Sequence, residues 1–285
     1  MAEDKTFADW VGRVVEADDS VPEQAARALA ATLNLGPEAR SAACIVVDGP
    51  LPPLWHWLAF LPDAPASRLA SSGEAPDPLL PPLPGRRVWA GGRLRFHGEL
   101  RIGEMIHRRS EILAIAREEA PTGARTRVTL SHELSTARNL GVSEVQEFVF
   151  SETLRQTEAP AGPGAPLPAP AAWSVQLPLD PVRLFRFSAA TFDAERLHYD
   201  LAYARAQGCP GLAAQDRLLA ILLLEAARRR REGAWPAGVA LQRMRPFYAT
   251  GPLGLLAGLE DRGRQALAAT DAAGVCLAAE IAWEA

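Results

Sequence analysis

Apolar and polar positions along the chain form two successive series, each with helical patterns ahead of strand patterns. In the first series, residues 6–33 have apolar side chains at helical spacing. Pro22 interrupts this pattern, and Asp19 or Ser20 can cap a second helix after it. Residues 54–61 predict a helical or irregular stretch, and alternating residues then predict strands. These strands cover residues 93–96, 105–115, 125–134 and 145–150.

The second series repeats this order in the C-terminal part of the chain. Residues 185–192 predict a short apolar strand, and residues 218–231 predict a strong helix with a basic end. Strand patterns follow at residues 239–248, 253–260, 265–270 and 275–283. The repeated order predicts an α+β fold in which two antiparallel sheets each wrap a long central helix. We infer the duplication from element order, because the two series share little residue identity.

A segment dense in Pro, Gly and Ala separates the two series at residues 158–172. Proline fixes φ and lacks an N–H donor, so this segment is incompatible with a helix or an inner strand. It predicts an extended linker. The expected organisation is an N-terminal half of residues 1–157, the linker, and a C-terminal half of residues 173–285.

Composition describes a globular protein with a sizeable core. The 285 residues are 48% hydrophobic and 22% charged, with a net charge of −4. A mildly acidic chain argues against a nucleic-acid partner, which usually needs a basic face. Cys44, Cys209 and Cys276 are widely spaced, which argues against a disulfide framework, and no Cys/His cluster has zinc-ligand spacing. The sequence has no signal-peptide pattern and no membrane-spanning apolar run, so we expect a cytoplasmic protein.

The candidate chemistry lies in residues 187–200, just before the strong helix. Asp193 stands five residues before His198, and side chains at that spacing on a regular helix point about 140° apart. The two meet only if the chain bends between them, and Glu195 and Arg196 suit an exposed bend. An acid and an imidazole held together can protonate one carbon while delivering or removing water at its neighbour. The alternative is a surface acid near a partly buried histidine.

Several stretches resemble one enzyme family. Residues 187–230 resemble the hydratase half of MaoC-like enoyl-thioester hydratases, but match their Gly-Asp-x-Asn-Pro-x-His signature only in the Asp and His. Residues 51–57, 80–94, 185–192 and 197–200 are similar to a branch with two hot-dog repeats. That branch includes 3-methylfumaryl-CoA (mesaconyl-CoA) hydratases and mitochondrial 3-hydroxyacyl-thioester dehydratases. The resemblance implies a double hot-dog fold and the hydration or dehydration of an α,β-unsaturated acyl-CoA thioester.

The resemblance also implies catalytic roles and partners. Asp193 and His198 would hold the catalytic water, one deprotonating it for attack at the β-carbon and the other protonating the α-carbon. In dehydration, His198 would remove the α-proton and Asp193 would protonate the departing hydroxyl. We expect an acyl-CoA substrate, no cofactor, no metal, no membrane association and a homodimer. A branched dicarboxylic acyl group is the expected substrate, and a fatty-acid-type hydroxyacyl thioester on CoA or acyl-carrier protein is the alternative.

The start of the strong helix departs from the family pattern. The family places its oxyanion site at this helix N-terminus, where backbone N–H groups face the thioester oxygen. Gln215, Asp216 and Arg217 stand there instead of His-Gly followed by a small residue or Pro. A carboxylate about 4 Å from a forming enolate costs around 4 kcal/mol at an effective dielectric constant near 20. We expect Asp216 to turn away as an N-cap or to be neutralised by Arg217. The alternative is a decayed acyl-CoA-binding protein.

Five further residues are candidates for substrate contact. Tyr199 and Gly211 are expected beside the catalytic pair. Arg86, Arg87 and Arg93 are candidates for holding the carboxylate of a dicarboxylic acyl group, because paired arginines bind carboxylates bidentately. The alternative for the arginines is ordinary surface charge.

Aromatic residues gather in the N-terminal half, at Trp55, His56, Trp57 and Trp89. Such a cluster either lines an acyl pocket or packs in the core. We expect Trp57 and Trp89 in the core, since large aromatic side chains are mostly buried, and leave the role of His56 open.

Overall fold

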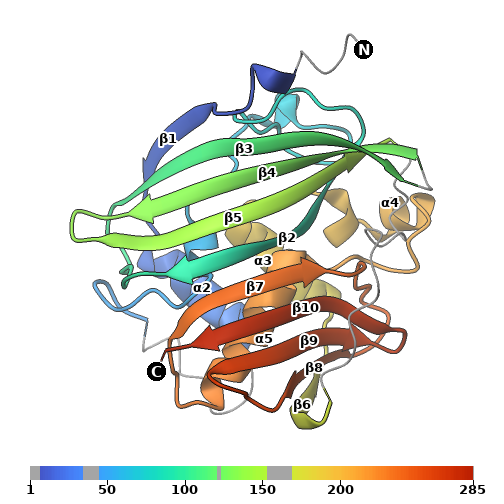
Figure 1. The fold of residues 1–285 in the computed structure, drawn as a ribbon. Coiled ribbons are helices and arrows are strands. Elements are labelled where there is room, and N and C mark those ends of the chain that lie inside the picture. The colour runs from blue at the N-terminus through green and yellow to red at the C-terminus, as the bar shows by residue number, and fades with distance from the viewer. Residues whose placement is uncertain (1–6, 35–44, 121–122, 153–168, 285) are drawn as a thin grey trace.

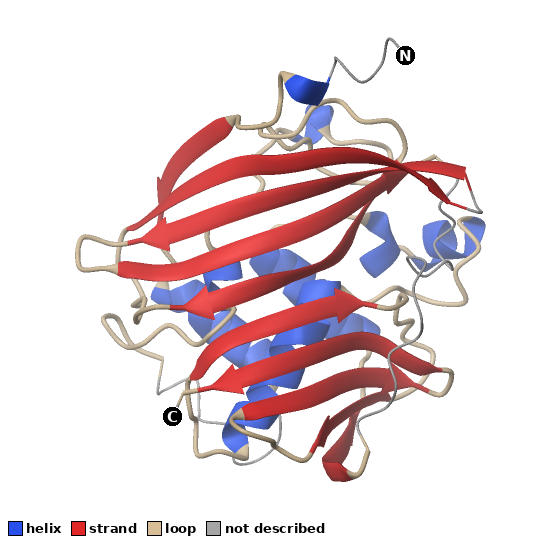
Figure 2. Cartoon of the chain, in the orientation of Figure 1, coloured by secondary structure: helices blue, strands red, loops and turns tan. Residues whose placement is uncertain are grey.

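A computed structural model describes residues 7–34, 45–120, 123–152 and 169–284. Its strands form one continuous ten-stranded antiparallel sheet, in the order β1-β3-β4-β5-β2-β7-β10-β9-β8-β6. Figure 1 shows the sheet as a curved layer, with the helices α2, α3 and α5 on one face of it. The same two layers stand out when the chain is coloured by secondary structure (Figure 2).

The two predicted strand sets occupy the two sides of this sheet. The N-terminal strands are β1 (Val14–Asp19), β2 (Arg86–Phe96), β3 (Ile106–Ala120), β4 (Gly123–Ser135) and β5 (Leu140–Ser151). The C-terminal strands are β6 (Ala171–Leu177), β7 (Pro236–Arg243), β8 (Leu253–Gly258), β9 (Arg264–Asp271) and β10 (Gly274–Trp283). The strands predicted within residues 93–150 and 239–283 are therefore confirmed, except that the strand predicted to reach residue 248 ends at Arg243.

The three longer helices, α2, α3 and α5, lie on one face of the sheet. The helices are α2 (Glu23–Leu33), α3 (Pro181–Thr191), α4 (Leu201–Ala206) and α5 (Asp216–Arg229), and the 3-10 turns are η2 (Trp55–Leu58), η3 (Ala66–Arg68) and η4 (Arg196–His198). Helix α5 confirms the predicted strong helix. Ten of its residues are buried, because its own side chains are apolar on almost every side of the helix.

The two halves meet where β2 pairs with β7. Gly91 lies opposite Gln242 and Gly92 lies opposite Leu241. Gly91 has φ +145°, and a Cβ atom there would come within 2.3 Å of the Leu241 carbonyl oxygen. Only glycine fits this backbone without strain, so this position allows the two strand sets to join edge to edge.

One apolar core extends across that junction. Its buried members include Leu29 and Leu54 from the N-terminal half and Leu222, Leu255 and Trp283 from the C-terminal half. A core shared in this way ties the halves together by apolar burial as well as by strand pairing.

The strand predicted at residues 185–192 is wrong, because this segment belongs to α3. Asp180 caps the helix by accepting a hydrogen bond from the Arg183 N–H at 2.8 Å, and Pro181 occupies its first turn. Leu184, Phe187 and Ser188 are buried at helical spacing. Phe185 and Ala189 also contributed to the apolar pattern that suggested a strand, but both are exposed on the helix.

The secondary structure of the N-terminal segment also differs from the prediction. Residues 14–19 form β1, which pairs with β3, and the helix begins only at Glu23. Neither Asp19 nor Ser20 caps it, since Pro22 occupies the N-cap position. Asp19 instead accepts a hydrogen bond from the Phe60 N–H at 2.6 Å. Most of the predicted linker and Cys44 lie outside the described residues, and the last two residues of the predicted linker, 171 and 172, belong to β6.

Candidate active site

A bend between α3 and η4 brings the predicted pair together. Phe192 ends α3 in the left-handed conformation, with φ 52°, and its N–H donates to the Ser188 carbonyl. The N–H of Asp193 also donates to that carbonyl, at 2.9 Å. The η4 turn then returns His198 toward Asp193. The predicted bend is therefore present, and it takes the form of a helix end followed by a 3-10 turn.

His198 makes contacts through both of its ring nitrogens. Its Nδ1 lies 2.7 Å from the Ala213 carbonyl oxygen, so Nδ1–H donates there. Its Nε2 lies 3.6 Å from Asp193 Oδ2 and 3.4 Å from Glu195 Oε2. The imidazole is thus oriented with Nε2 directed at two carboxylates, as general acid–base chemistry requires.

The charged groups of this cluster stabilise one another in their ionised forms. Burial lowers the pKa of His198, but Glu195 and Asp193 outweigh burial and raise it to about 9. Burial raises the pKa of Glu195, but His198 and Arg86 outweigh burial and lower it to about 2. His198 is therefore an imidazolium at neutral pH, and Glu195 is a carboxylate.

Glu195 is the site residue that sequence reasoning missed. It was expected on an exposed bend, but it contacts His198 and forms an ion pair with Arg86 at the start of β2. Its i,i+3 spacing from His198 was the available signal, since a 3-10 turn aligns residues three apart. Asp193 is the more accessible carboxylate, with 36% of its side chain exposed against 27% for Glu195.

The N-terminus of α5 points toward the same region. Gln215 occupies the N-cap position but makes no capping hydrogen bond. Its Nε2 donates instead to Ser188 Oγ at 2.8 Å and to the Leu184 carbonyl at 3.1 Å, which ties α5 to α3. The first N–H groups of α5 are therefore not occupied by the N-cap side chain, and N–H groups at a helix N-terminus favour an anionic partner.

Asp216 is neutralised, but not in either of the expected ways. It is the first residue of α5 rather than its N-cap, and its Oδ2 lies 3.0 Å from the Nε of Arg243 on β7. Burial raises the pKa of Asp216, and Arg243 opposes this increase. Arg217 lies instead toward the N-terminal half, with its guanidinium over the Trp57 ring.

Two of the three candidate arginines already have carboxylate partners. Arg86 pairs with Glu195, and Arg87 pairs with Glu74 at 2.7 Å and Asp77 at 3.5 Å. Arg93 is exposed on β2. The arginines are therefore not brought together as one carboxylate-binding group.

Tyr199 and Gly211 flank the cluster. Tyr199 directly follows His198, is exposed, and donates a hydrogen bond from its hydroxyl to the Ala194 carbonyl at 3.2 Å. Gly211 is buried, and a Cβ atom there would lie 2.7 Å from Thr250 Cγ2. Gly211 thus permits close packing of the segment that leads into α5.

The aromatic cluster surrounds a buried carboxylate. Glu144 accepts a hydrogen bond from Trp57 Nε1 at 3.0 Å and from Gln146 Nε2 at 2.8 Å, and it lies 3.3 Å from His56 Nε2. Trp57 is buried, as predicted, and Trp89 packs partly buried against the core. The contact with Glu144 accounts for His56, whose role was open.

A polar row crosses the inner face of the N-terminal strands. Ser110, His132 and Glu144 are successive partners on β3, β4 and β5. Ser110 Oγ and His132 Nδ1 lie 2.8 Å apart, and burial lowers the pKa of His132 to about 4. We call these three residues the polar row. A continuous polar row is unusual inside a sheet, where apolar residues normally cover the core face.

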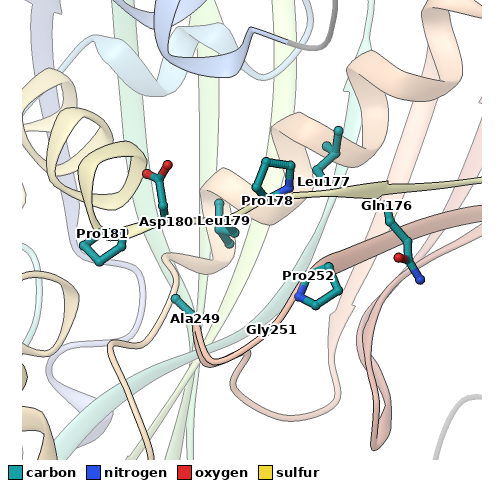
Figure 3. Close-up of a pocket in the computed structure, with 9 residues that line it drawn as sticks. All are labelled: Gln176, Leu177, Pro178, Leu179, Asp180, Pro181, Ala249, Gly251 and Pro252. Atoms are coloured by element: carbon teal, nitrogen blue, oxygen red, sulfur yellow. The ribbon is translucent and has the colours of Figure 1, made fainter.

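A surface pocket of about 560 Å³ lies elsewhere on the C-terminal half (Figure 3). It is lined by Gln176, Leu177, Pro178, Leu179, Asp180, Pro181, Ala249, Gly251 and Pro252. None of the predicted site residues belongs to this lining.

Comparison with solved structures defines the class of protein. A MaoC-like dehydratase from Phytophthora capsici matches 96% of this chain and 95% of its own, with a TM-score of 0.72 at 10% identity. A double-hotdog-fold protein from Mycobacterium tuberculosis matches 96% of both chains, with a TM-score of 0.55 at 15% identity. The protein has the double hot-dog fold, as the sequence predicted, with its two repeats joined in one sheet.

The sequence then identifies the family: this chain belongs to the hydroxyacyl-thioester dehydratase type 2 family, which matches residues 54–248. It is 38% identical over 262 residues to mesaconyl-C(4)-CoA hydratase from Chloroflexus aurantiacus, covering 87% of each chain. It is 27% identical over 220 residues to the mitochondrial hydroxyacyl-thioester dehydratase type 2 of Schizosaccharomyces pombe, covering 64% of this chain and 70% of that one. Among the described residues, no helix has the length and apolarity needed to cross a membrane.

Proposed function

We propose that this protein hydrates an enoyl-CoA with a short dicarboxylic acyl chain, similar to mesaconyl-C4-CoA. The carrying observation is the orientation of His198, whose Nε2 faces Asp193 and Glu195 while Nδ1 is held by a carbonyl. The 38% identity to a mesaconyl-C(4)-CoA hydratase over most of both chains supports the same reaction.

Asp193 and His198 divide the proton transfers between them. The Asp193 carboxylate, which is the more exposed of the two, accepts a proton from water as the water attacks the β-carbon. The His198 imidazolium delivers its Nε2 proton to the α-carbon. Dehydration uses the same groups in reverse, and such assistance is worth about 10²–10⁴-fold in rate.

The start of α5 serves as the oxyanion site in this proposal. Backbone N–H groups at a helix N-terminus stabilise a developing enolate oxygen. The departure at Gln215 and Asp216 does not remove these donors, since any residue there keeps its N–H. Repulsion from the Asp216 carboxylate is offset by Arg243, whose Nε lies 3.0 Å from it.

The polar row favours a short polar acyl group over a long alkyl chain. Ser110, His132 and Glu144 occupy the inner face where an alkyl tail would need apolar contacts. A fatty-acid-type hydroxyacyl-thioester dehydratase is the second candidate, supported by the 27% identity to the mitochondrial enzyme.

We further propose that the two halves of the chain have different roles. Residues 173–285 carry the catalytic groups, residues 1–157 shape the acyl site, and residues 158–172 link them. The expected setting is the cytoplasm, with CoA as the carrier and a homodimer as the assembled form. Light scattering of the purified protein tests the last point, and a monomer would contradict it.

The test of function is the loss of enoyl-thioester absorbance over a substrate panel. Wild type, His198→Ala and Asp193→Asn are each assayed with mesaconyl-CoA, crotonyl-CoA and a medium-chain enoyl-CoA. We expect fastest turnover of mesaconyl-CoA, none with His198→Ala, and at least a tenfold loss with Asp193→Asn. Preference for the medium-chain substrate would support the second candidate. Inactivity on every member would favour a decayed acyl-CoA-binding protein.

A further inference from the structure

Arg217 differs from the other arginines near the site because no carboxylate of the described residues forms an ion pair with it. Among the described residues, its contacts are Gln146 Oε1 at 3.4 Å from Nη2 and the Trp57 ring, 5.4 Å from the guanidinium carbon. Arg86, Arg87 and Arg243 each form an ion pair with a protein carboxylate. A partly buried guanidinium without such a partner retains donors for an anionic ligand.

The surface beneath Arg217 is held rigidly. Trp57 is fixed by its hydrogen bond to Glu144, and Gln146 is fixed by a second bond to the same carboxylate. His56 lies against the remaining oxygen of Glu144. Glu144 is therefore committed to its neighbours, and the guanidinium rests on a preorganised platform.

Arg217 is also within electrostatic reach of Asp193. It occupies the first turn of that helix, where the N–H groups face the thioester oxygen in the proposed reaction. Burial lowers the pKa of Arg217, while Glu144 and Asp193 raise it. Arg217 and Asp193 are both partly exposed.

We propose that Arg217 binds the distal carboxylate of the acyl group and thereby selects dicarboxylic over monocarboxylic thioesters. This inference rests on the proposed function. In mesaconyl-C4-CoA the carboxylate is attached to the β-carbon, the carbon on which Asp193 directs water. A carboxylate there meets the guanidinium with charge-assisted hydrogen bonds. A methyl group there leaves a desolvated cation unpaired.

The experiment measures the binding of two saturated analogues that cannot react. Succinyl-CoA and butyryl-CoA differ in carrying a carboxylate or a methyl group at the same position, and calorimetry gives their dissociation constants. We expect wild type to bind succinyl-CoA about 100-fold more tightly. Arg217→Met should remove that preference while keeping its affinity for butyryl-CoA. Arg217→Lys should keep part of it, because lysine retains the charge without the planar fork.

Arg229→Met is the matched control, because Arg229 is an exposed arginine in the last turn of the same helix. It should keep the full preference. Arg217→Gln serves as a second variant if Arg217→Met does not fold, as judged by thermal unfolding. The inference is overturned if wild type shows no preference, or if the Arg217 variants weaken both ligands equally or neither. Because binding needs no turnover, these results are separate from failure of the hydration assay.

Discussion

At the scale of single residues, the chemistry depends on partners that sequence spacing does not reveal. Asp193 and His198 could be selected from the sequence because they are an acid and an imidazole in a stretch resembling a catalytic signature. Arg243, and the pairing of Arg86 with Glu195, could not, because each arginine reaches the site from a strand distant in sequence. Such ion pairs are long-range consequences of the fold.

Replacing Glu195 tests how the charge of His198 is maintained. Glu195→Gln removes a carboxylate that raises the pKa of His198, so that pKa should fall from about 9. The imidazolium is lost as pH rises through this pKa. The basic limb of the kcat/KM profile should therefore lie near pH 9 in wild type and move to lower pH in the variant. An unmoved limb would show that Glu195 does not set the His198 charge.

The Asp216–Arg243 pair is tested by a double-mutant cycle. Arg243→Met leaves the partly buried Asp216 carboxylate unpaired, which should cost roughly 3 kcal/mol of stability and reduce turnover. Asp216→Asn removes the charge that Arg243 balances. The double variant Asp216→Asn/Arg243→Met should therefore recover most of the stability and of the turnover that Arg243→Met loses. Denaturant unfolding measures the first, and enoyl-thioester hydration measures the second. Additive losses in the double variant would rule out the neutralising role.

At the scale of elements, the strands were easier to predict than the helix before the site. Alternation with a buried face identifies strands such as β4 and β5 directly. In α3, apolar residues on both the buried and exposed sides hide the helical period. Asp180 followed by Pro181 was the better signal, because an N-cap acid before an N1 proline is typical of a helix start.

The end of α3 makes a testable contribution to the bend. Phe192 has φ 52° and is 61% exposed, so its side chain contributes little packing while its backbone is strained. Phe192→Gly should leave stability unchanged or raise it by up to about 1 kcal/mol. Phe192→Val should lower it by roughly 1–2 kcal/mol, because a β-branched residue resists this conformation. Thermal unfolding measures both, and an equal loss in both variants would contradict the assigned backbone strain.

At the scale of the whole molecule, the sequence predicted two repeats but not the way they join. Pairing of β2 with β7 connects residues about 150 positions apart, and no local pattern encodes it. The conformational requirement at Gly91 appears only once these strands are adjacent. The shared core has the same origin, since its buried members come from both halves of the chain.

Gly91→Ala tests this junction. The added methyl group would meet the Leu241 carbonyl oxygen in a backbone conformation unfavourable to alanine. We expect a loss of about 2 kcal/mol or more in unfolding free energy. Because both halves share one core, unfolding should remain a single transition. Two separate transitions in wild type would contradict the shared core.

The most direct test of the hydration mechanism follows oxygen from solvent into product. Wild type and His198→Ala are incubated with mesaconyl-CoA in water enriched in oxygen-18. Mass spectrometry then measures the mass of the acyl product. The account predicts one oxygen-18 atom in the product of wild type and no hydrated product with His198→Ala. Hydration by His198→Ala at the wild-type rate would contradict it, as would a wild-type protein that leaves mesaconyl-CoA unchanged.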